Sequence, residues 1–472
     1  MTHRTFIIPG DDSHLATIRD HLTDEVCGIF LHVDVPEAVA RRNGSCAGKF
    51  RDRIITFGSL TRPMRAPLPP AQFDAYDRCL RAVLRDERVH FLATRTYMNS
   101  PLNNTVVIER IVANTLRIVA ETRPTRLLSS STPHSVQAWT FARCFEELGL
   151  PVYVLERSPI NNRAWIYRGL DGQRVVERAA PLPADLTPYT RSQVQEQVSS
   201  VAGARDARGF LVSRMDLSVL KGAETNDFWS PRRELGNVFG GSLKALPIRL
   251  ASSWLKRKIY HSYQSLAVTQ LPDAPFVIYF MHYQPERSSL PEALFHTQQL
   301  IALRQIANTL PAGWKLVVRE HPSMWLLPLD LGVRTMDYYE QIAALPNTQL
   351  ASMDLDTFEL IDRCAVVSTL TGSVGFQGLL RGKPAFVFGL PAYKDHPACI
   401  TVATHAELAQ AFATISTPSF ARLLSPAALE EYLRRVERDS IVADPSDTQW
   451  LSIRIKNFAR LYREVLTGEL AL

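Results

Sequence analysis

The chain has 472 residues, of which 46% are hydrophobic, and its 53 Lys and Arg residues slightly outnumber its 47 Asp and Glu residues. This length exceeds what one ordinary core holds, so two domains with appendages are expected. No apolar run approaches the roughly 18–20 residues that span a bilayer, and the first residues lack the basic and apolar regions of a secretion signal. A cytoplasmic globular protein is therefore expected.

The net charge of +6 is a mild excess for this length. It suits an anionic substrate or proximity to an acidic membrane surface. A nucleic-acid-binding protein would carry a dense basic stripe with interleaved aromatic residues, and the sequence shows none. The cysteines have no CxxC pair and no metal-binding spacing, so we expect reduced packing residues. They are Cys27, Cys46, Cys79, Cys144, Cys364 and Cys399.

The first half of the chain alternates strand and helix patterns, as in a degenerate α/β domain. Ser135 follows a Ser/Thr-rich loop and is expected to cap a helix. The strand–loop–helix–strand order around it implies a parallel sheet, which brings His134 and Glu156–Arg157 to neighbouring strand ends. A hairpin is predicted over Ala164–Glu177. Strands are predicted at Thr5–Pro9, Gly28–Val33, Val89–Ala93 and Pro151–Leu155, and helices at Gln72–Arg85, Val106–Glu121 and Val136–Leu148.

Residues 180–250 carry Pro, Gly and mixed charge, and they predict only one helix, near Arg191–Val201. The following stretch, Leu250–Leu266, is basic and aromatic and predicts a helix that joins the two halves. Two roles remain open for it: an interdomain packing helix, or a helix that lies on a membrane surface.

The second half repeats a strand–helix unit, which predicts a doubly wound parallel sheet. Its strands are predicted at Phe276–Met281, Lys315–Arg319, Gln349–Ala351, Ala365–Ser368 and Ala385–Phe388. Its helices are predicted near Pro291–Leu310, Asp337–Ala344, Thr357–Arg363 and Ser373–Arg381. Further helices follow at Thr404–Ile415, Pro426–Arg438 and Ser446–Thr467, the last long enough to return to the first domain. The expected domains are residues 1–250, a linker helix at 251–270, residues 271–420, and C-terminal helices at 421–472.

The segment Lys315–Tyr393 holds most of the polar groups that follow predicted strands. Open α/β sheets bind ligands at these carboxyl ends. His321, held by Pro322, closes the strand KLVVRE, and its imidazole N–H suits an anionic phosphate oxygen. A hydrogen-bonded surface histidine is the alternative.

A second candidate is the turn Ser368–Ser373, which follows a strand and precedes a helix. Hydroxyl groups and backbone N–H groups at a helix N-terminus form an anion site. The turn lacks the spacing of a Walker loop or of GxGxxG, so it is neither an ATP P-loop nor a dinucleotide fingerprint. An ordinary Ser/Thr helix cap is the alternative.

A third candidate is the sequence HYQPE, which follows the strand FVIYFM. His282 and Glu286 at this rim would grip a sugar or serve as acid and base. A polar loop at the end of a strand is the alternative.

Together, HYQPE, an apolar helix, REHP, the Ser/Thr-Gly-Ser turn with its helix, and FGLPAY resemble the capsule polysaccharide biosynthesis family, which includes bacterial β-Kdo transferases. The resemblance covers about Phe276–Tyr393. It implies an α/β fold of the GT-B kind, with two facing Rossmann-like domains, C-terminal helices that pack back, and a nucleotide sugar bound by the C-terminal domain.

The His-Pro and Ser/Thr elements are also similar to the CMP-binding elements of GT-B sialyltransferases, which implies a CMP-activated acidic sugar such as Kdo. Gln377 departs from the family pattern, in which an acidic residue is usual in this helix. No cofactor beside the nucleotide-sugar donor, and no metal, is implied. The donor-binding residues implied are Arg319, His321, Pro322, Ser368, Thr371, Gly372, Ser373, Gln377 and Tyr393.

The resemblance further implies a glycan or glycolipid acceptor bound across from the donor, with peripheral association at the inner membrane. On that side His134 or Glu156 is expected to act as general base, and Arg157 to bind an acidic sugar or lipid phosphate. The catalytic candidates are thus His134, Glu156, His282 and Glu286. Three alternatives stay open: a transferase that uses a UDP-sugar, an epimerase of the same fold, and an inactive member that binds glycans or serves assembly.

Overall fold

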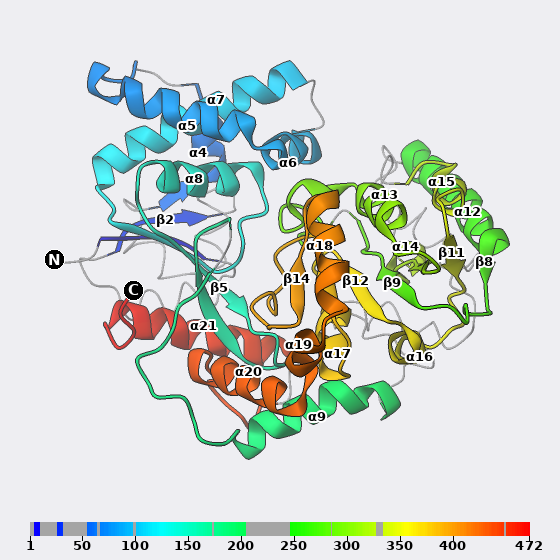
Figure 1. The fold of residues 1–472 in the computed structure, drawn as a ribbon. Coiled ribbons are helices and arrows are strands. Elements are labelled where there is room, and N and C mark those ends of the chain that lie inside the picture. The colour runs from blue at the N-terminus through cyan, green and yellow to red at the C-terminus, as the bar shows by residue number, and fades with distance from the viewer. Residues whose placement is uncertain are drawn as a thin grey trace. The chain divides into compact units, whose positions relative to one another are not determined.

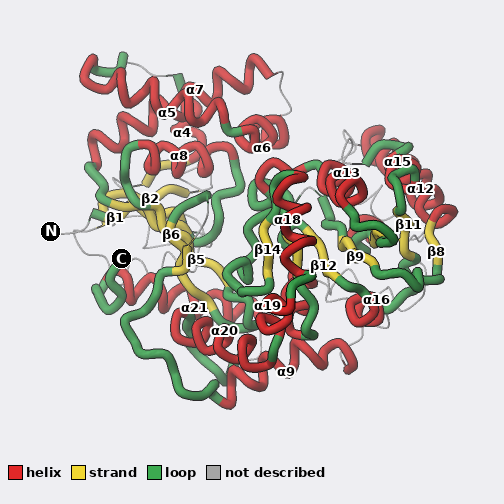
Figure 2. Tube along the Cα trace, in the orientation of Figure 1, coloured by secondary structure: helices red, strands yellow, loops and turns green. Residues whose placement is uncertain are grey.

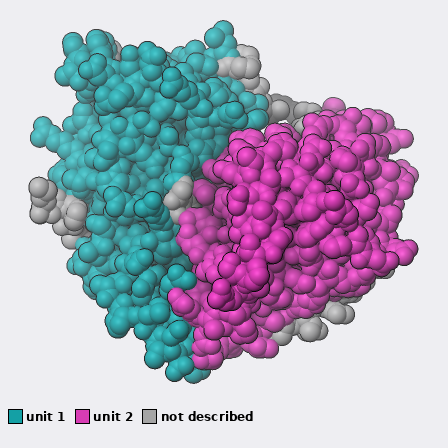
Figure 3. Space-filling model, viewed as in Figure 1, with its two compact units in different colours: residues 1–190, 434–472 teal, residues 191–433 magenta. Residues whose placement is uncertain are grey.

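The computed structural model describes residues 4–9, 26–31, 54–63, 67–97, 101–171, 174–203, 246–284, 286–326, 334–447 and 450–472. The chain folds into two compact units, shown in different colours in Figure 3. Unit 1 comprises Met1–Thr190 and Arg434–Leu472, and unit 2 comprises Arg191–Leu433. Each unit contains a seven-stranded sheet. The predicted α/β class with two Rossmann-like sheets is confirmed.

The sheet of unit 1 has the order β3-β2-β1-β4-β5-β6-β7. The first five strands run parallel, and β6 and β7 are antiparallel to their neighbours. Every residue of β1 is buried, as in parallel sheets that are covered on both faces. The strands are β1 (Thr5–Ile8), β2 (Val26–Leu31), β3 (Ile54–Thr56), β4 (Arg126–Ser129), β5 (Val152–Arg157), β6 (Ala164–Arg168) and β7 (Arg174–Val175).

Helices cover both faces of this sheet (Figures 1 and 2). On one face lies α8 (Val136–Glu147), whose Phe141 ring stacks on that of Phe30 and contacts the tilted ring of Phe6. Ser135 caps α8 as predicted, since its side chain accepts the N–H of Ala138. Onto α8 pack α4 (Phe57–Thr61), α5 (Phe73–Arg85), α6 (Glu87–Tyr97) and α7 (Pro101–Thr122).

The opposite face is covered by the C-terminal helix α21 (Trp450–Leu466). Phe458 and Tyr462 of this helix join the apolar core formed by the strands, and the Tyr462 hydroxyl donates to the carbonyl of Ile8 at 3.3 Å. The prediction that the last helix packs back onto the first domain is confirmed.

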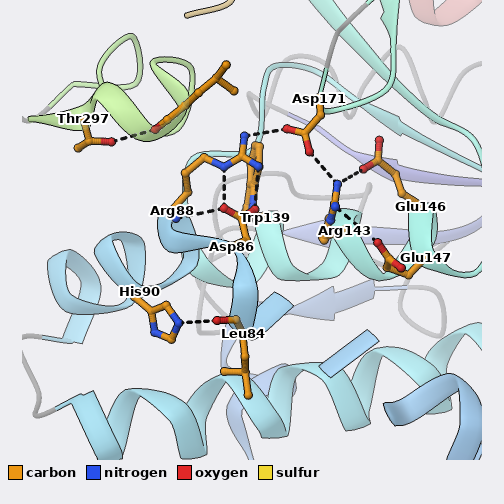
Figure 4. Close-up of polar contacts among 11 residues, drawn as sticks. Leu84, Asp86, Arg88, His90, Trp139, Arg143, Glu146, Glu147, Asp171 and Thr297 are labelled. Carbon is orange, nitrogen blue, oxygen red and sulfur yellow. Dashed lines mark hydrogen bonds and ion pairs between the residues drawn. The ribbon is translucent and has the colours of Figure 1, made fainter. Parts of the chain in front are cut away.

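A cluster of charged residues ties the helical layer to the turn between β6 and β7 (Figure 4). The guanidinium of Arg88 forms two hydrogen bonds with the carboxylate of Asp86, at 2.7 and 2.9 Å, and a third with Asp171 at 2.8 Å. Trp139 donates its indole N–H to Asp86 at 2.9 Å, and its ring lies 4.6 Å from the Arg88 guanidinium. Arg143 donates to the other Asp171 oxygen at 2.9 Å.

Two helices carry the chain between the units: α9 (Pro188–Gly203) on the way out and α20 (Pro426–Asp439) on the way back. Buried Arg163, between β5 and β6, holds the unit 1 ends of both. It donates to the Thr190 hydroxyl at 3.3 Å, to the Glu437 carbonyl at 2.9 Å and to the Ser440 hydroxyl at 2.7 Å.

The sheet of unit 2 is parallel throughout and has the order β14-β13-β12-β9-β10-β11-β8. After β9 the chain adds β10 and β11 on one side of it, and then adds β12, β13 and β14 on the other side. The strand order therefore changes direction between β9 and β12. The strands are β8 (Ala267–Val268), β9 (Phe276–Phe280), β10 (Lys315–Arg319), β11 (Thr348–Ala351), β12 (Val366–Thr369), β13 (Ala385–Val387) and β14 (Cys399–Thr401).

Unit 2 also has helices on both faces of its sheet. One face packs against α12 (Leu246–Leu266), α13 (Gln299–Thr309), α15 (Tyr338–Ala343) and α18 (His405–Ile415). The other packs against α16 (Thr357–Arg363) and α17 (Ser373–Leu380). The unit also contains shorter elements: the 3-10 helices Leu294–Thr297 and Arg422–Leu424, α14 (Ser323–Leu326) and α19 (Pro418–Ala421). No helix in the described part of the chain is both long enough and apolar enough to cross a membrane.

Three predictions differ from the structure. Val89–Ala93 is part of helix α6, because Val89, Leu92 and Ala93 are buried at helical spacing against α7 and α8. The helix predicted from Pro291 begins only at Gln299, after the 3-10 turn. The predicted boundary at residue 250 lies elsewhere, since α12 belongs to unit 2 and packs on α15, and the chain leaves unit 1 after Thr190.

Some predictions fall outside the described residues. These include residues 32–33 of the second strand, Cys46, Gly172 in the hairpin and Pro285 in HYQPE.

Candidate functional site

The loops after β9, β10 and β12 lie next to one another, because these strands are neighbours in the parallel sheet. The sheet changes direction between β9 and β12, which is where open α/β sheets bind their ligands. His282 follows β9, His321 follows β10, and the turn from Thr369 to Gly372 follows β12. The sequence motifs singled out above are therefore gathered at one edge of unit 2.

The turn after β12 is held in place by a buried tyrosine and by close packing around Gly372. Helix α17 begins at Ser373, and its N-cap residue, Gly372, has no side chain to accept a helix N–H. Buried Tyr393 donates its hydroxyl to the Gly372 carbonyl at 2.5 Å. A Cβ atom at Gly372 would lie 2.8 Å from the Thr369 hydroxyl oxygen and 3.3 Å from the His282 ring, so only glycine fits here without a shift. The helix N-terminus offers the positive end of the helix dipole to an anion.

His282 is buried, and both of its ring nitrogens have partners. Nε2 accepts the backbone N–H of Thr371 at 3.2 Å and lies 3.0 Å from the Thr369 hydroxyl. Nδ1 lies 3.2 Å from the Ser288 hydroxyl. Burial, reinforced by the positive charges of His321 and Arg334, lowers the pKa of His282 to about 3. This imidazole is neutral at physiological pH and connects the β9 and β12 loops.

Glu286 completes a chain of hydrogen bonds that starts at this ring. The Ser288 hydroxyl donates to the Glu286 carboxylate at 2.8 Å, and the Ser288 carbonyl accepts the Thr371 hydroxyl at 2.9 Å. The two predicted residues of HYQPE are thus linked to each other, through Ser288, and to the β12 turn. Their catalytic roles stay predictions.

Beneath the β10 loop lies a fully buried ion pair between Glu320 and Arg334, whose side chains are both 0% exposed. One Glu320 oxygen accepts the backbone N–H of His321 at 2.6 Å. The other accepts Arg334 Nε at 3.1 Å and the Tyr339 hydroxyl at 2.5 Å. The negative charge of Glu320 raises the pKa of Arg334 against the opposing effect of burial. The Glu320 carboxylate of this pair also holds the backbone of His321 in place.

Two glutamines extend this network to the β9 loop. Arg334 donates to the Gln284 side-chain oxygen at 2.8 Å and to the His282 carbonyl at 3.2 Å. Gln299, the first residue of α13, accepts the His282 N–H at 2.7 Å, and donates to the His282 carbonyl at 3.0 Å and to Gln284 at 2.9 Å. The backbone of His282 is thus held on both sides.

The other predicted donor residues lie around this network in different environments. His321 is half-buried, Pro322 is buried, and Ser373 is exposed. Arg319 is buried and donates to the carbonyls of the loop that follows β11. Ser368 and Gln377 are also buried. Direct contact of these residues with a donor stays a prediction.

The acceptor-side candidates lie together in unit 1. Because β4 and β5 are parallel neighbours, the loop that carries His134 adjoins the end of β5. There Glu156, which is 8% exposed, accepts the Thr132 N–H at 3.1 Å and the Arg157 N–H at 3.3 Å. His134 is exposed, and its Nδ1 lies 3.2 Å from the Thr132 carbonyl oxygen. The predicted neighbourhood is confirmed, and the roles stay predictions.

Arg334 and Gln299 were not anticipated from the sequence, and Glu320 was quoted only within its motif. No cluster of three or more His, Cys, Asp or Glu side chains suited to a metal ion occurs among the described residues.

Residues 295–423 match the model of the family described as capsule polysaccharide biosynthesis protein. This segment, about a quarter of the chain, is similar to that family. The matched residues lie in unit 2 and contain β10 with His321, the Glu320–Arg334 pair, and the whole β12 turn with α17. The family resemblance seen in the sequence motifs is confirmed for this segment.

Several solved structures are similar to this chain at low identity. The β-Kdo 2,7 transferase KpsC of Thermosulfurimonas dismutans is 13% identical over 62% of this chain and 73% of its own, with a TM-score of 0.29. A UDP-GlcNAc 2-epimerase from Neisseria meningitidis is 9% identical over 92% of this chain and 97% of its own, with a TM-score of 0.24. At such scores these likenesses decide neither fold nor activity. No curated protein matches the sequence.

Proposed function

We propose that the protein is a glycosyltransferase of surface polysaccharide synthesis, and that it transfers Kdo or another acidic sugar from its CMP ester to a glycan or glycolipid acceptor. One observation carries this proposal. The family-matched segment contains His321, in the loop after β10, and the N-terminus of α17, after β12, and these two strands flank β9, beside which the unit 2 sheet changes direction. That arrangement suits the phosphate of a nucleotide donor.

On this proposal, unit 2 stabilises the departing CMP. The single phosphodiester of the donor lies against the imidazole of His321 and the backbone N–H groups at Ser373. These N–H groups stabilise the negative charge that develops on the phosphate as the bond between the sugar and the phosphate breaks. His282, Glu320 and Arg334 fix the positions of these loops. The N–H groups that contact the phosphate therefore need little reorganisation during the reaction.

The acceptor is assigned to unit 1. A general base must remove the proton of the acceptor hydroxyl as the bond to the sugar forms. His134 and Glu156 are the candidates, and Arg157 provides a cation for an acidic sugar or a lipid phosphate. A kinetic comparison of His134→Ala with Glu156→Gln identifies the base, because loss of the base lowers turnover more than it weakens acceptor binding.

Peripheral attachment at the inner membrane is part of the proposal. The described residues of α12 expose Leu250 and Trp254, which are 50% and 56% exposed, together with Arg257, Lys258 and His261. The sequence of this helix contains no acidic residue. Such a face suits anionic lipid headgroups. Co-sedimentation with vesicles that contain phosphatidylglycerol tests this contact. Binding to these vesicles should fall in Trp254→Ser, and the wild type should not bind neutral vesicles. Equal binding of the wild type to anionic and neutral vesicles would argue against the contact.

The donor is tested by thermal denaturation of the purified protein with CMP, UDP, GDP and ADP. A ligand that binds only the folded state raises the melting temperature by mass action. We expect CMP alone to raise it, and His321→Ala to lose the effect. An increase with UDP or GDP instead would overturn the CMP donor and favour a UDP-sugar transferase or an epimerase.

An inactive, glycan-binding member is the second candidate, and Gln377 favours it because the resemblance puts an acidic residue in this helix. Nucleotide binding without turnover of CMP-Kdo, in the presence of a suitable acceptor, would support that reading.

A further inference from the structure

We infer that Arg334 is a positioning residue for the donor site: through one buried guanidinium it sets the loops after β9 and β10 relative to each other. This inference rests on the proposed function of the same site. Arg334 is adjacent to neither His321 nor His282 in the sequence, and it is 0% exposed, so it acts through other residues and not on the donor itself.

The geometry of the guanidinium supports this role. Nε binds the Glu320 carboxylate at 3.1 Å, Nη1 binds the Gln284 side-chain oxygen at 2.8 Å, and Nη2 binds the His282 carbonyl at 3.2 Å. The acceptors thus come from the ends of two neighbouring strands. Because the guanidinium is planar and rigid, it fixes the spacing between them.

Two of these acceptor residues, Glu320 and His282, each bind a backbone N–H next to a proposed donor contact. The carboxylate of Glu320 holds the backbone N–H of His321 at 2.6 Å. The ring of His282 holds the backbone N–H of Thr371, in the turn that leads into α17, at 3.2 Å. A shift of Arg334 is therefore passed both to the imidazole and to the helix N-terminus that the donor phosphate is proposed to contact.

A role in folding alone makes a different prediction from a role in positioning. Loss of a buried ion pair that only stabilises the fold lowers the resistance of the protein to urea, but leaves the CMP affinity of the folded molecules unchanged. Loss of positioning weakens CMP binding even where every molecule is folded, because the phosphate contacts no longer lie at the correct spacing.

The test uses Arg334→Lys. Lysine keeps the positive charge beside Glu320, but its compact ammonium lacks the rigid fork that spans all three acceptors. The dissociation constant for CMP is measured by calorimetry on the full chain, at a temperature where urea titration shows the protein to be folded. We expect CMP binding to weaken about tenfold or more, as for other directly coupled residues.

Arg163→Lys is the matched control. Arg163 is also a buried arginine with side-chain and carbonyl acceptors, but it lies in unit 1, between β5 and β6. It should lose stability without a change in the dissociation constant for CMP. Equal loss of CMP affinity in both variants would overturn the role of Arg334.

Should Arg334→Lys not fold, the paired change Glu320→Gln with Arg334→Met removes both charges and leaves no buried charge without a partner. We expect this variant to fold and to bind CMP at least about tenfold more weakly. CMP affinity equal to that of the wild type in either folded variant would overturn the inference alone. Absence of CMP binding by the wild type would instead contradict the proposed donor, and with it this role.

Discussion

The Nε2 atom of His282 accepts the backbone N–H of Thr371 at 3.2 Å. A backbone amide is only a donor, so Nε2 must carry the lone pair, and the ring proton lies on Nδ1, facing the Ser288 hydroxyl at 3.2 Å. The relationship fixes one tautomer of a buried, neutral imidazole. It also gives this histidine a task that requires it to stay neutral, since a protonated Nε2 would face the Thr371 N–H with another proton.

Stability should therefore depend on pH through His282. Its pKa is lowered by burial to about 3 in the folded protein, against about 6.5 when unfolded. Between these values the unfolded chain binds more protons, so stability is complete above about pH 6.5 and is lost as the pH falls toward 3. From pH 7 to pH 5 this one group should cost about 2 kcal/mol. Urea titrations of wild type and His282→Gln at both pH values should show a smaller loss in the variant, and equal losses would contradict the assignment.

Replacing Gly372 should damage the donor site more than the fold. The Cβ of Gly372→Ala would press on the Thr369 hydroxyl oxygen at 2.8 Å and on the His282 ring at 3.3 Å, which displaces the start of α17. We expect CMP binding to weaken at least about tenfold. Gly313→Ala is the control, because its Cβ meets nothing within 4 Å and only its positive φ of 80° is strained. That variant should lose about 1 kcal/mol of stability and bind CMP normally; the reverse pattern would be inconsistent with the described turn.

Tyr393→Phe tests whether this tyrosine supports the turn or contacts the donor. Its hydroxyl donates to the Gly372 carbonyl at 2.5 Å, and its ring stacks on Phe376. Removal of the hydroxyl alone should cost about 1 kcal/mol of stability, as for a typical buried hydrogen bond. CMP affinity should fall modestly. Abolished CMP binding with full stability would instead indicate that the hydroxyl contacts the donor.

The charged cluster of unit 1 predicts a large loss of stability in Arg88→Met. Asp86, whose side chain is 7% exposed, would keep its indole partner but lose the guanidinium. Breaking such a largely buried pair should cost about 2–4 kcal/mol. Arg81→Met is the control, because Arg81 and Asp77 form a pair that is 71% and 65% exposed. It should change stability by less than about 0.5 kcal/mol. Urea titration separates the two, and a small effect of Arg88→Met would mean that water replaces the guanidinium readily.

The strands that form the donor edge were predictable because they are short, apolar and end abruptly at polar residues. In a parallel sheet such strands read as continuous apolar runs, as in β9 and β10. The same interpretation was wrong at Val89–Ala93, where a short segment with four apolar residues fits a buried strand or a helix equally well. The signal that distinguishes them is the spacing of Val89, Leu92 and Ala93, the three residues that are buried.

The role of Arg334 could not be predicted from the sequence alone. Its acceptors lie 14, 50 and 52 residues away along the chain. Only the parallel pairing of β9 with β10 brings them together, and no local pattern marks an arginine that will become buried. The predicted motifs located the site, whereas the network that holds it depends on tertiary structure.

The placement of α21 has a consequence for how the protein is made. Unit 2 is one uninterrupted segment, whereas unit 1 requires its final residues, 434–472. A ribosome must add 276 residues between Thr190 and Leu466 before α21 can pack on its face of the N-terminal sheet. At 5–20 residues per second this takes roughly 14–55 s. During synthesis the apolar residues that pack against α21 therefore lack this helix while unit 2 is made, and that interval is when a chaperone would bind this chain.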